Sequence, residues 1–199
     1  MVYNAFGKFI KEVKNKMELF KGRPADMSGR LERETRVYDF LDNLGIEYER
    51  TDHFESPATT MEACQEIDKV LGTLICKNLF LCNRQKTQFY LLLMPGDKPF
   101  KTKEITNQIG SARLSFAGPE FMLKYLDIEP GAVSLMGLMN DHEGNVRLLV
   151  DEDVLKEEYL GCHPCVNTSS LKIKTADAFG KYLDAVGHSM TTVHLTGEE

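Results

Sequence analysis

The feature that most constrains the fold is a pair of apolar segments near the middle of the chain, separated by a short polar turn. Residues 73–82 and 88–94 are rich in the aliphatic and aromatic side chains that form buried strands, whereas residues 83–87 are polar. Two such segments joined by a turn of this length are typical of a β-hairpin. We therefore expect a sheet that contains at least one antiparallel pair of strands.

Helical and strand patterns are interspersed along the rest of the chain. The spacing of apolar residues, with caps such as Thr102 and Thr175, predicts helices over residues 31–44, 59–70, 102–109, 118–125, 152–159 and 176–186. Short apolar runs predict strands over residues 46–50, 113–117, 132–138, 146–150 and 170–174. This order favours an α+β domain with a mixed β-sheet flanked by helices over a doubly wound parallel sheet.

The two ends of the chain differ from this central part. Apolar residues recur at helical spacing from Tyr3 to Phe20. This predicts an extra amphipathic helix that packs on the domain or on a partner, with membrane-surface binding as the alternative. A linker rich in Gly, Pro and Ser follows at residues 22–29. We therefore divide the chain into an N-terminal helix and linker (1–29), a central domain (30–187) and a polar tail (188–199).

Composition excludes several classes of protein. The chain has 199 residues, is 42% hydrophobic and carries a formal net charge of -6, so any nucleic-acid contact must come from a local basic patch. It contains no run of 18 apolar residues, which predicts no membrane span, and its N-terminus does not resemble a secretory signal. Its five cysteines are odd in number and scattered, which favours a reducing, cytoplasmic location.

Residues 160–170, L-G-C-H-P-C-V-N-T-S-S, place thiols, an imidazole, an amide and hydroxyls in one loop. Cys162 and Cys165 have the spacing of a dithiol redox site, but such a motif should open a helix, and here a loop and a strand follow it. Zinc would need a second pair of ligands, which is missing. A cysteine nucleophile would need a base among His53, His142 and His163, which the sequence does not pair with either thiol. We therefore predict no metal and no cofactor.

Lys77 is the more informative residue, because it interrupts an apolar strand. Lysine is almost never fully buried without a partner. Lys77 lies either at a solvent-facing position of an edge strand or on the floor of a pocket, where its ammonium would meet a phosphate or a carboxylate. For the loop residues a purely structural role is open too, since Asn167 and Thr168 can hold the loop by local hydrogen bonds.

Four segments occur in a characteristic order along the chain. They are C-K-N-L-F-L at 76–81, L-S-F-A at 114–117, P-G-A-V-S-L-M-G-L-M-N-D at 130–141 and G-C-H-P-C-V-N-T-S-S-L-K-I at 161–173. Together they resemble the family of YbaK-like aminoacyl-tRNA deacylases, related to the editing domain of bacterial prolyl-tRNA synthetases, and above all its free-standing ProX type. The resemblance covers roughly residues 31–186 and leaves 1–29 as an addition.

The resemblance implies a single α+β domain with a central mixed sheet and a hydrolytic activity without a cofactor. The bond broken would be the ester between a wrongly attached amino acid and the 3′-terminal adenosine of a tRNA, with alanine on the proline tRNA as the substrate of this type. The implied partners are the tRNA acceptor end and, as a further candidate, prolyl-tRNA synthetase.

Site residues are carried over by position. Lys77 resembles the strand lysine that engages the terminal nucleotide, and together with His163 it is the predicted catalytic pair. The predicted substrate-binding residues are Thr60, Met61, Asn78, Gly161, Pro164, Asn167 and Thr168. The loop departs from the G-x-x-x-P pattern of the synthetase-embedded domain, because Gly161 and Pro164 are one residue closer together. Which backbone amides face the substrate therefore stays open.

The expected mechanism is direct attack of water on the ester, because no Ser-His-Asp set is visible. A ribose hydroxyl is a candidate helper, and backbone N–H groups of the loop would stabilise the oxyanion by about 3–4 kcal/mol each. The alternative function is a non-catalytic module that senses an amino acid or aminoacyl-tRNA and acts on a protein partner. The sequence leaves the amino acid, the tRNA and the oligomeric state open.

Overall fold

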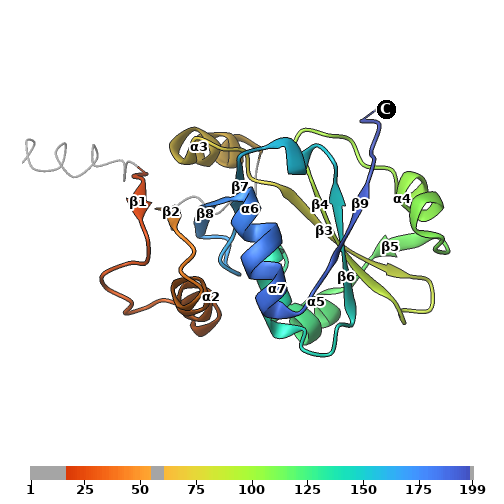
Figure 1. The fold of residues 1–199 in the computed structure, drawn as a ribbon, viewed down its shortest axis with the longest axis horizontal. Coiled ribbons are helices and arrows are strands. Elements are labelled where there is room, and N and C mark those ends of the chain that lie inside the picture. Colours follow the sequence, from red (N-terminus) through yellow and green to blue (C-terminus); the bar gives the residue numbers. More distant parts are fainter. Residues whose placement is uncertain (1–16, 55–60, 198–199) are drawn as a thin grey trace, which may run out of the picture.

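The computed structural model describes residues 17–54 and 61–197, which form two sheets that share one core (Figure 1). The first sheet is antiparallel, in the order β1-β2-β8-β7, and the second is mixed, in the order β5-β3-β4-β6-β9. The strands of the first sheet are β1 (Phe20–Lys21), β2 (Tyr48–Asp52), β7 (Tyr159–Cys162) and β8 (Ser169–Lys174). Those of the second are β3 (Lys77–Asn83), β4 (Phe89–Met94), β5 (Leu114–Phe116), β6 (Val146–Asp151) and β9 (Met190–Val193).

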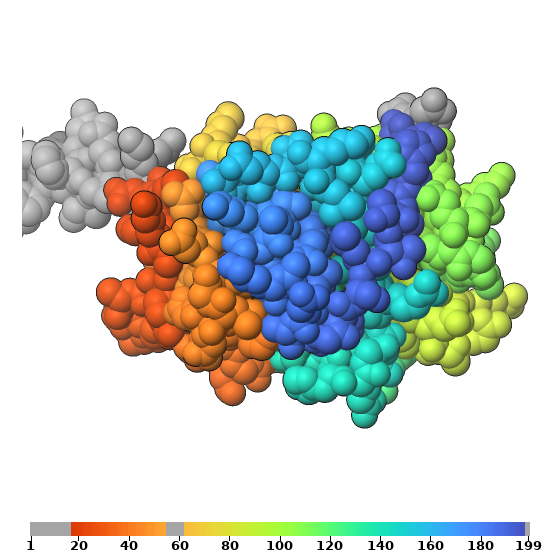
Figure 2. Space-filling view, viewed as in Figure 1, coloured from red at the N-terminus to blue at the C-terminus, as the bar shows by residue number. Residues whose placement is uncertain are grey.

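Helices cover both sheets and the boundary between them. The α-helices are α2 (Glu32–Asn43), α3 (Met61–Leu71), α4 (Thr102–Ile109), α5 (Pro119–Leu126), α6 (Thr175–Asp177) and α7 (Leu183–Val186). A π-helical turn at Ala178–Tyr182 joins α6 to α7, and this segment lies in front of the boundary between the sheets (Figure 1). In the space-filling view the same segment, in blue, fills the middle of this face (Figure 2).

The main hydrophobic core contains side chains from both sheets, which makes them one folding unit. Leu171 of β8, Leu148 of β6 and Tyr182 of the π turn all belong to it and are almost fully buried. A smaller cluster on the other face of the mixed sheet includes Leu92 of β4 and Ile105 of α4. Because successive side chains of a strand point to opposite faces, β4 serves both clusters, and this explains its continuous apolar run.

The predicted α+β architecture with a mixed sheet is confirmed, and so is the hairpin. β3 and β4 are antiparallel, with Lys77 opposite Met94 and Cys82 opposite Phe89. The strand begins at Lys77 rather than at Thr73, so the lysine lies at the end of the strand and not in its middle. The second, antiparallel sheet was not predicted.

Two predicted elements in the second half of the chain are wrong. Residues 132–138 do not form a strand; a 3₁₀ turn covers Leu135–Asn140, capped by Ser134, whose Oγ accepts from the Met136 amide at 3.2 Å. Residues 152–159 do not form a helix, because only Val154–Lys156 make a 3₁₀ turn and the chain then enters β7. The apolar residues at these positions are buried by tertiary packing and not by a helical or strand face.

The two predicted threonine caps are also wrong. Thr102 and Thr175 are the first residues of α4 and α6, and the capping positions are Lys101 and Lys174, which make no side-chain cap hydrogen bond. The two threonines nevertheless located the start of each helix to within one residue.

The chain ends also depart from expectation. Phe20 lies in β1, paired with β2, so the predicted helix does not extend to this residue; residues 3–16 lie outside the described part of the chain. The tail is not a free polar segment, because Met190–Val193 form β9, parallel to β6, and Val193 and Leu195 are buried. The predicted boundary at residues 29 and 30 stays a prediction. No helix in the described ranges combines the length and hydropathy needed to cross a bilayer.

Candidate functional site

A cavity of about 370 Å³ lies where the start of β3 meets α3. Its walls come from segments that are far apart in the sequence: α3, residues 74–78, the turn at Gly96–Asp97, Gly131 with Val133, and His163. Three of the predicted site residues, Lys77, Asn78 and His163, line it together. The fold therefore brings the strand motif and the loop motif to one place.

Lys77 is held at the entrance of β3 by a backbone carbonyl. Its Nζ donates to the Lys98 carbonyl oxygen at 3.1 Å, and the side chain is only partly buried. Lys98 is itself anchored, since its Nζ lies 3.0 Å from both carboxylate oxygens of the fully buried Asp151. The turn that carries the Lys98 carbonyl is thus fixed to the mixed sheet, and it fixes the direction of the Lys77 ammonium in turn.

Asn78 projects to the opposite side of β3, because neighbouring side chains alternate along a strand. Its Nδ2 donates to the Cys76 carbonyl at 2.8 Å. Its Oδ1 is buried and has no hydrogen-bond partner among the described residues. A buried acceptor without a partner is unfavourable by about 1–3 kcal/mol, so this oxygen is a natural acceptor for a ligand donor.

His163 is buried, and burial lowers the pKa of its imidazole, so the ring is neutral at pH 7. Its Nδ1 lies 3.1 Å from the Ser169 carbonyl oxygen, which only accepts, so Nδ1 carries the proton and Nε2 is left as an acceptor. Ser170 Oγ lies 3.2 Å from the same Nδ1 and 2.9 Å from His53 Nε2. This network fixes the tautomer and the orientation of the ring.

Gly161 lies in β7 behind the cavity and does not line it. Its carbonyl accepts from the Cys76 amide at 3.1 Å. A Cβ at this position would be 2.6 Å from the Leu74 carbonyl oxygen and 2.9 Å from Ile75 Cα. Glycine is therefore needed so that the segment leading into Lys77 can pack against β7.

The other predicted loop residues do not line the cavity either. Pro164 is buried, and the Thr168 carbonyl accepts from the His53 amide at 2.9 Å. Asn167 Nδ2 lies 3.3 Å from the position that a Cβ on Gly131 would occupy. Thr60 is outside the described residues. Met61 is the first residue of α3, and the structure describes its backbone only.

The two cysteines of the loop do not face the cavity. Cys162 and Cys165 are free thiols, each 1% exposed. Burial raises the pKa of Cys165 to about 12 and that of Cys162 higher still, so both remain protonated. Protonated, inaccessible thiols are poor nucleophiles, which argues against the dithiol and cysteine-nucleophile interpretations. In the described ranges no three His, Cys, Asp or Glu side chains gather closely enough to hold a metal ion.

Two parts of the cavity wall were missed by sequence reasoning. Asp68 of α3 lines the cavity, its Oδ1 accepts from the Ile75 amide at 2.9 Å, and burial raises the pKa of its carboxyl. The turn at Gly96–Asp97 lines it as well and was not predicted as part of a site. Nothing in the local pattern marks either one, because each is recruited by packing against residues 74–78.

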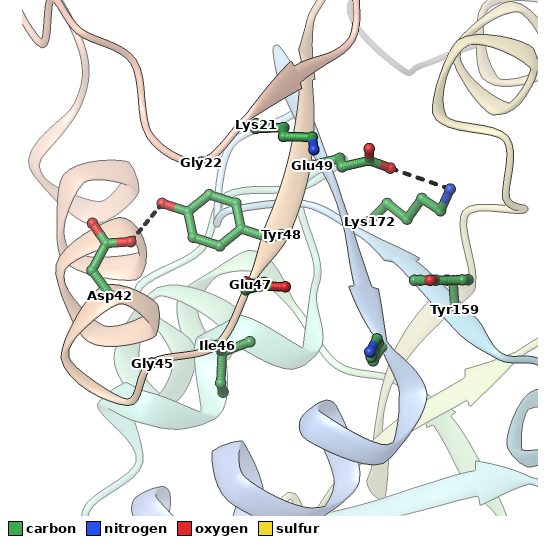
Figure 3. Close-up of a pocket in the computed structure, with 11 residues that line it drawn as sticks. Lys21, Gly22, Asp42, Gly45, Ile46, Glu47, Tyr48, Glu49, Tyr159 and Lys172 are labelled. Carbon is green, nitrogen blue, oxygen red and sulfur yellow. Dashed lines mark hydrogen bonds and ion pairs between the residues drawn. The ribbon is translucent and has the colours of Figure 1, made fainter.

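A larger groove of about 640 Å³ crosses the antiparallel sheet, and four of its polar side chains are joined in two pairs (Figure 3). Lys172 Nζ lies 3.3 Å from Glu49 Oε2 and 4.6 Å from the centre of the Tyr159 ring. The Tyr48 hydroxyl donates to Asp42 Oδ1 at 3.1 Å. The smaller cavity, which holds an unpaired acceptor and a neutral imidazole, is therefore the candidate site.

Comparison with known proteins identifies the family of the chain. Residues 55–179, more than half of the chain, match the model of the aminoacyl-tRNA editing domain. The chain is 32% identical over 155 residues to the prolyl-tRNA editing protein ProX of Acetoanaerobium sticklandii, covering 78% of this chain and 93% of the relative. It is 28% identical to prolyl-tRNA synthetase associated domain-containing protein 1 of Mus musculus, covering 73% of this chain and 88% of the relative.

The fold is shared with solved structures as well. A crystal structure described as a proposed trans-editing enzyme for prolyl tRNA synthetase superposes with a TM-score of 0.61 at 18% identity, covering 83% of this chain and 98% of that one. The family resemblance carried by the four segments is confirmed. The chain belongs to the aminoacyl-tRNA editing domain family.

Proposed function

We propose that this protein hydrolyses the ester of mischarged tRNA, with alanine on the proline tRNA as its substrate. The observation that carries the proposal is the convergence of Lys77, Asn78 and His163 on one cavity from segments far apart in the sequence. A relative named as a prolyl-tRNA editing protein, matched over 93% of its length, supports the choice of tRNA.

Lys77 orients the terminal nucleotide through its charge. Its ammonium is already held in place by the Lys98 carbonyl, so little freedom is lost when a phosphate or ribose oxygen binds. A lysine placed in this way contributes by positioning the ester and takes no direct part in the bond changes.

His163 and Asn78 provide the acceptors that the chemistry needs. The Nε2 of the neutral His163 accepts a hydrogen bond from the attacking water or from the ribose hydroxyl that directs it. Asn78 Oδ1 accepts from a donor on the substrate, such as the α-ammonium of the amino acid. Neither role requires a covalent intermediate.

Water attack places negative charge on the carbonyl oxygen of the ester. Backbone N–H groups of the cavity wall are the proposed donors to this oxygen, worth about 3–4 kcal/mol each. Of the 163–168 loop only His163 reaches the cavity, so we assign the donors to the walls around Gly96 and Gly131 rather than to that loop. Glycine at these positions lets a substrate approach the backbone closely.

Selectivity for a small amino acid follows from the size of the cavity. Apolar groups of Ile75 and Val133 line it, and we assign to them the steric exclusion of larger side chains, which does not act on smaller ones. With a net charge of -6 the protein holds tRNA weakly and in a salt-sensitive way, mainly through the acceptor end. The proposed partner is prolyl-tRNA synthetase, and the proposed location is the cytoplasm.

The test is release of amino acid from proline tRNA charged with alanine or with cysteine. Lys77→Ala should lower alanine release by about 100-fold, because orientation is lost. Lys181→Ala removes the same charge from an exposed site outside the cavity and should leave the rate unchanged. If only cysteine is released, the substrate is cysteine on the proline tRNA and the assignment of the site stays the same. Binding of charged tRNA without any release would overturn the proposal in favour of a sensing module.

A further inference from the structure

An open depression of about 650 Å³ lies next to the candidate cavity, and Lys77 lines both. The other apolar and basic side chains that line it are Leu79, Phe100, Lys101, Lys103 and Phe116. It therefore combines aromatic and aliphatic surface with three ammonium groups. None of the described carboxylates lines it.

Phe116 is the most exposed large apolar side chain of the described residues, at 64%. It lies on β5, the edge strand of the mixed sheet, directly opposite Leu81 of β3. Residues opposite each other share a face of the sheet, so Phe116 stands on the same side of β3 as Leu79 and Lys77. The Phe100 ring contacts it edge to face, with the ring centres 6.4 Å apart, which holds one side of the ring and leaves the rest open.

The charge of this surface is opposite to that of the whole protein. Lys101 and Lys103 are exposed, and neither they nor Lys77 form an ion pair with a described residue. The chain as a whole carries a net charge of -6. A cluster of unpaired ammonium groups beside an exposed aromatic ring matches the chemistry of a single-stranded nucleic acid, whose phosphates and bases need these two kinds of contact.

We propose that this surface, the Phe116 platform (Lys77, Leu79, Phe100, Lys101, Lys103 and Phe116), binds the single-stranded nucleotides that precede the terminal adenosine of the tRNA. One base stacks on Phe116, and Lys101 and Lys103 contact the phosphates. Lys77 stands at the junction, so a strand with its terminal ester in the cavity continues directly onto the platform. The assignment rests on the proposed function of the cavity.

The test compares a substrate that carries these nucleotides with one that lacks them and the rest of the tRNA. Alanyl-tRNA carries them, whereas the alanyl ester of adenosine does not. Phe116→Ala should lower kcat/KM for alanyl-tRNA by about 10-fold, as expected for the loss of one stacked base, and leave the adenosine ester unchanged. Phe116→Trp should keep activity toward alanyl-tRNA. Phe20→Ala, which removes a 42% exposed ring from the other sheet, is the matched control and should affect neither substrate.

A binding measurement separates this proposal from the proposed function. A fluorescent single-stranded RNA ending in C-C-A should bind the wild type, and Phe116→Ala should weaken it about 10-fold. The Lys101→Ala, Lys103→Ala double variant should reduce the salt dependence of binding by a log-log slope of about 1.4, about 0.7 for each phosphate contact. A wild type that binds this RNA but hydrolyses neither ester would refute the proposed function and keep the platform.

Two results would overturn the platform. One is an equal loss on both substrates in Phe116→Ala, which would mean that the ring acts through the cavity. The other is unchanged alanyl-tRNA hydrolysis together with unchanged RNA binding, which would place the preceding nucleotides elsewhere.

Discussion

The start of β3 and the loop that contains Cys162 and Cys165 both hold candidate functional residues. In the structure, the first lines a cavity and the thiols of the second are buried. Lys77 and Asn78 line a cavity and keep groups available for a ligand. Cys162 and Cys165, although more reactive residue types, are 1% exposed and remain protonated. His163 sits between the cysteines and alone turns to the cavity. Exposure and local charge therefore decide which members of a motif can take part in a reaction.

The largest effect is expected where the two regions touch. Gly161→Ala would place a Cβ 2.6 Å from the Leu74 carbonyl, so the segment before Lys77 must move. We expect a loss of about 3 kcal/mol in the free energy of unfolding and a loss of about 100-fold in deacylation. Urea denaturation and alanyl-tRNA hydrolysis measure the two.

The matched control is Gly180→Ala, because a Cβ there would meet no atom within 4 Å. It should leave both stability and rate nearly unchanged. A Gly161→Ala protein that is as stable and active as the wild type would show that the close packing of β7 against residues 74–76 does not position Lys77.

The next largest effect on activity is expected at His163, which lies in the cysteine loop and lines the cavity with Lys77. His163→Asn should lower the deacylation rate by about 100-fold, since the Nε2 acceptor is lost. His142→Asn, at an exposed turn, is the control and should change nothing.

The pH dependence of the wild type follows from the lowered pKa of His163. The neutral ring persists below the ordinary value near 6.5, so the rate should hold at pH 6.5 and fall only at lower pH. Because the unfolded chain binds the proton more readily than the folded one, His163 should also make the protein less stable as the pH falls below about 6.5. A rate that falls with a midpoint above 6.5 would contradict the assignment.

A smaller effect is expected from the support of Lys77. Asp151→Asn leaves Lys98 with a weakened buried partner, so the turn that holds Lys77 loosens, and we expect a rate loss of about 10-fold. Asp153 contacts the same Lys98 Nζ at 2.7 Å from a partly exposed position, and Asp153→Asn should have a much smaller effect. Equal rates for the two variants would mean that the buried carboxylate does not act through Lys77.

The smallest effect on activity is expected at the cysteines. The double variant Cys162→Ala, Cys165→Ala should hydrolyse alanyl-tRNA within about twofold of the wild type, although stability falls by about 1 kcal/mol for each lost buried sulfur. In the native protein, iodoacetamide should label the partly exposed Cys64 before either of them. Loss of activity with an intact fold would restore the dithiol interpretation.

Much of the fold was predictable from local pattern. The hairpin of β3 and β4, the helix with Pro119 in its first turn and the exact extent of α4 follow from periodicity and turn residues, which act over a few neighbouring positions. The 3₁₀ turn at Leu135–Asn140 and the strand β9 were missed for the converse reason. Their apolar residues are too few to show a period, and packing against distant elements decides their conformation.

The features of the candidate site likewise fall into those that local sequence predicts and those that depend on tertiary packing. Residue type and spacing are sufficient to identify the family, the position of Lys77 at an apolar strand and the presence of His163 in a polar loop. Three-dimensional packing, in contrast, determines that His163 and not the cysteines faces the cavity, that Gly161 serves packing, and that Asp68 and the Gly96–Asp97 turn join the wall. The pairing of β2 with β8, and the hydrogen bond between His53 and Ser170, connect residues more than 100 positions apart. No local pattern encodes which of these residues meet, since their contacts depend on how distant elements pack in the core.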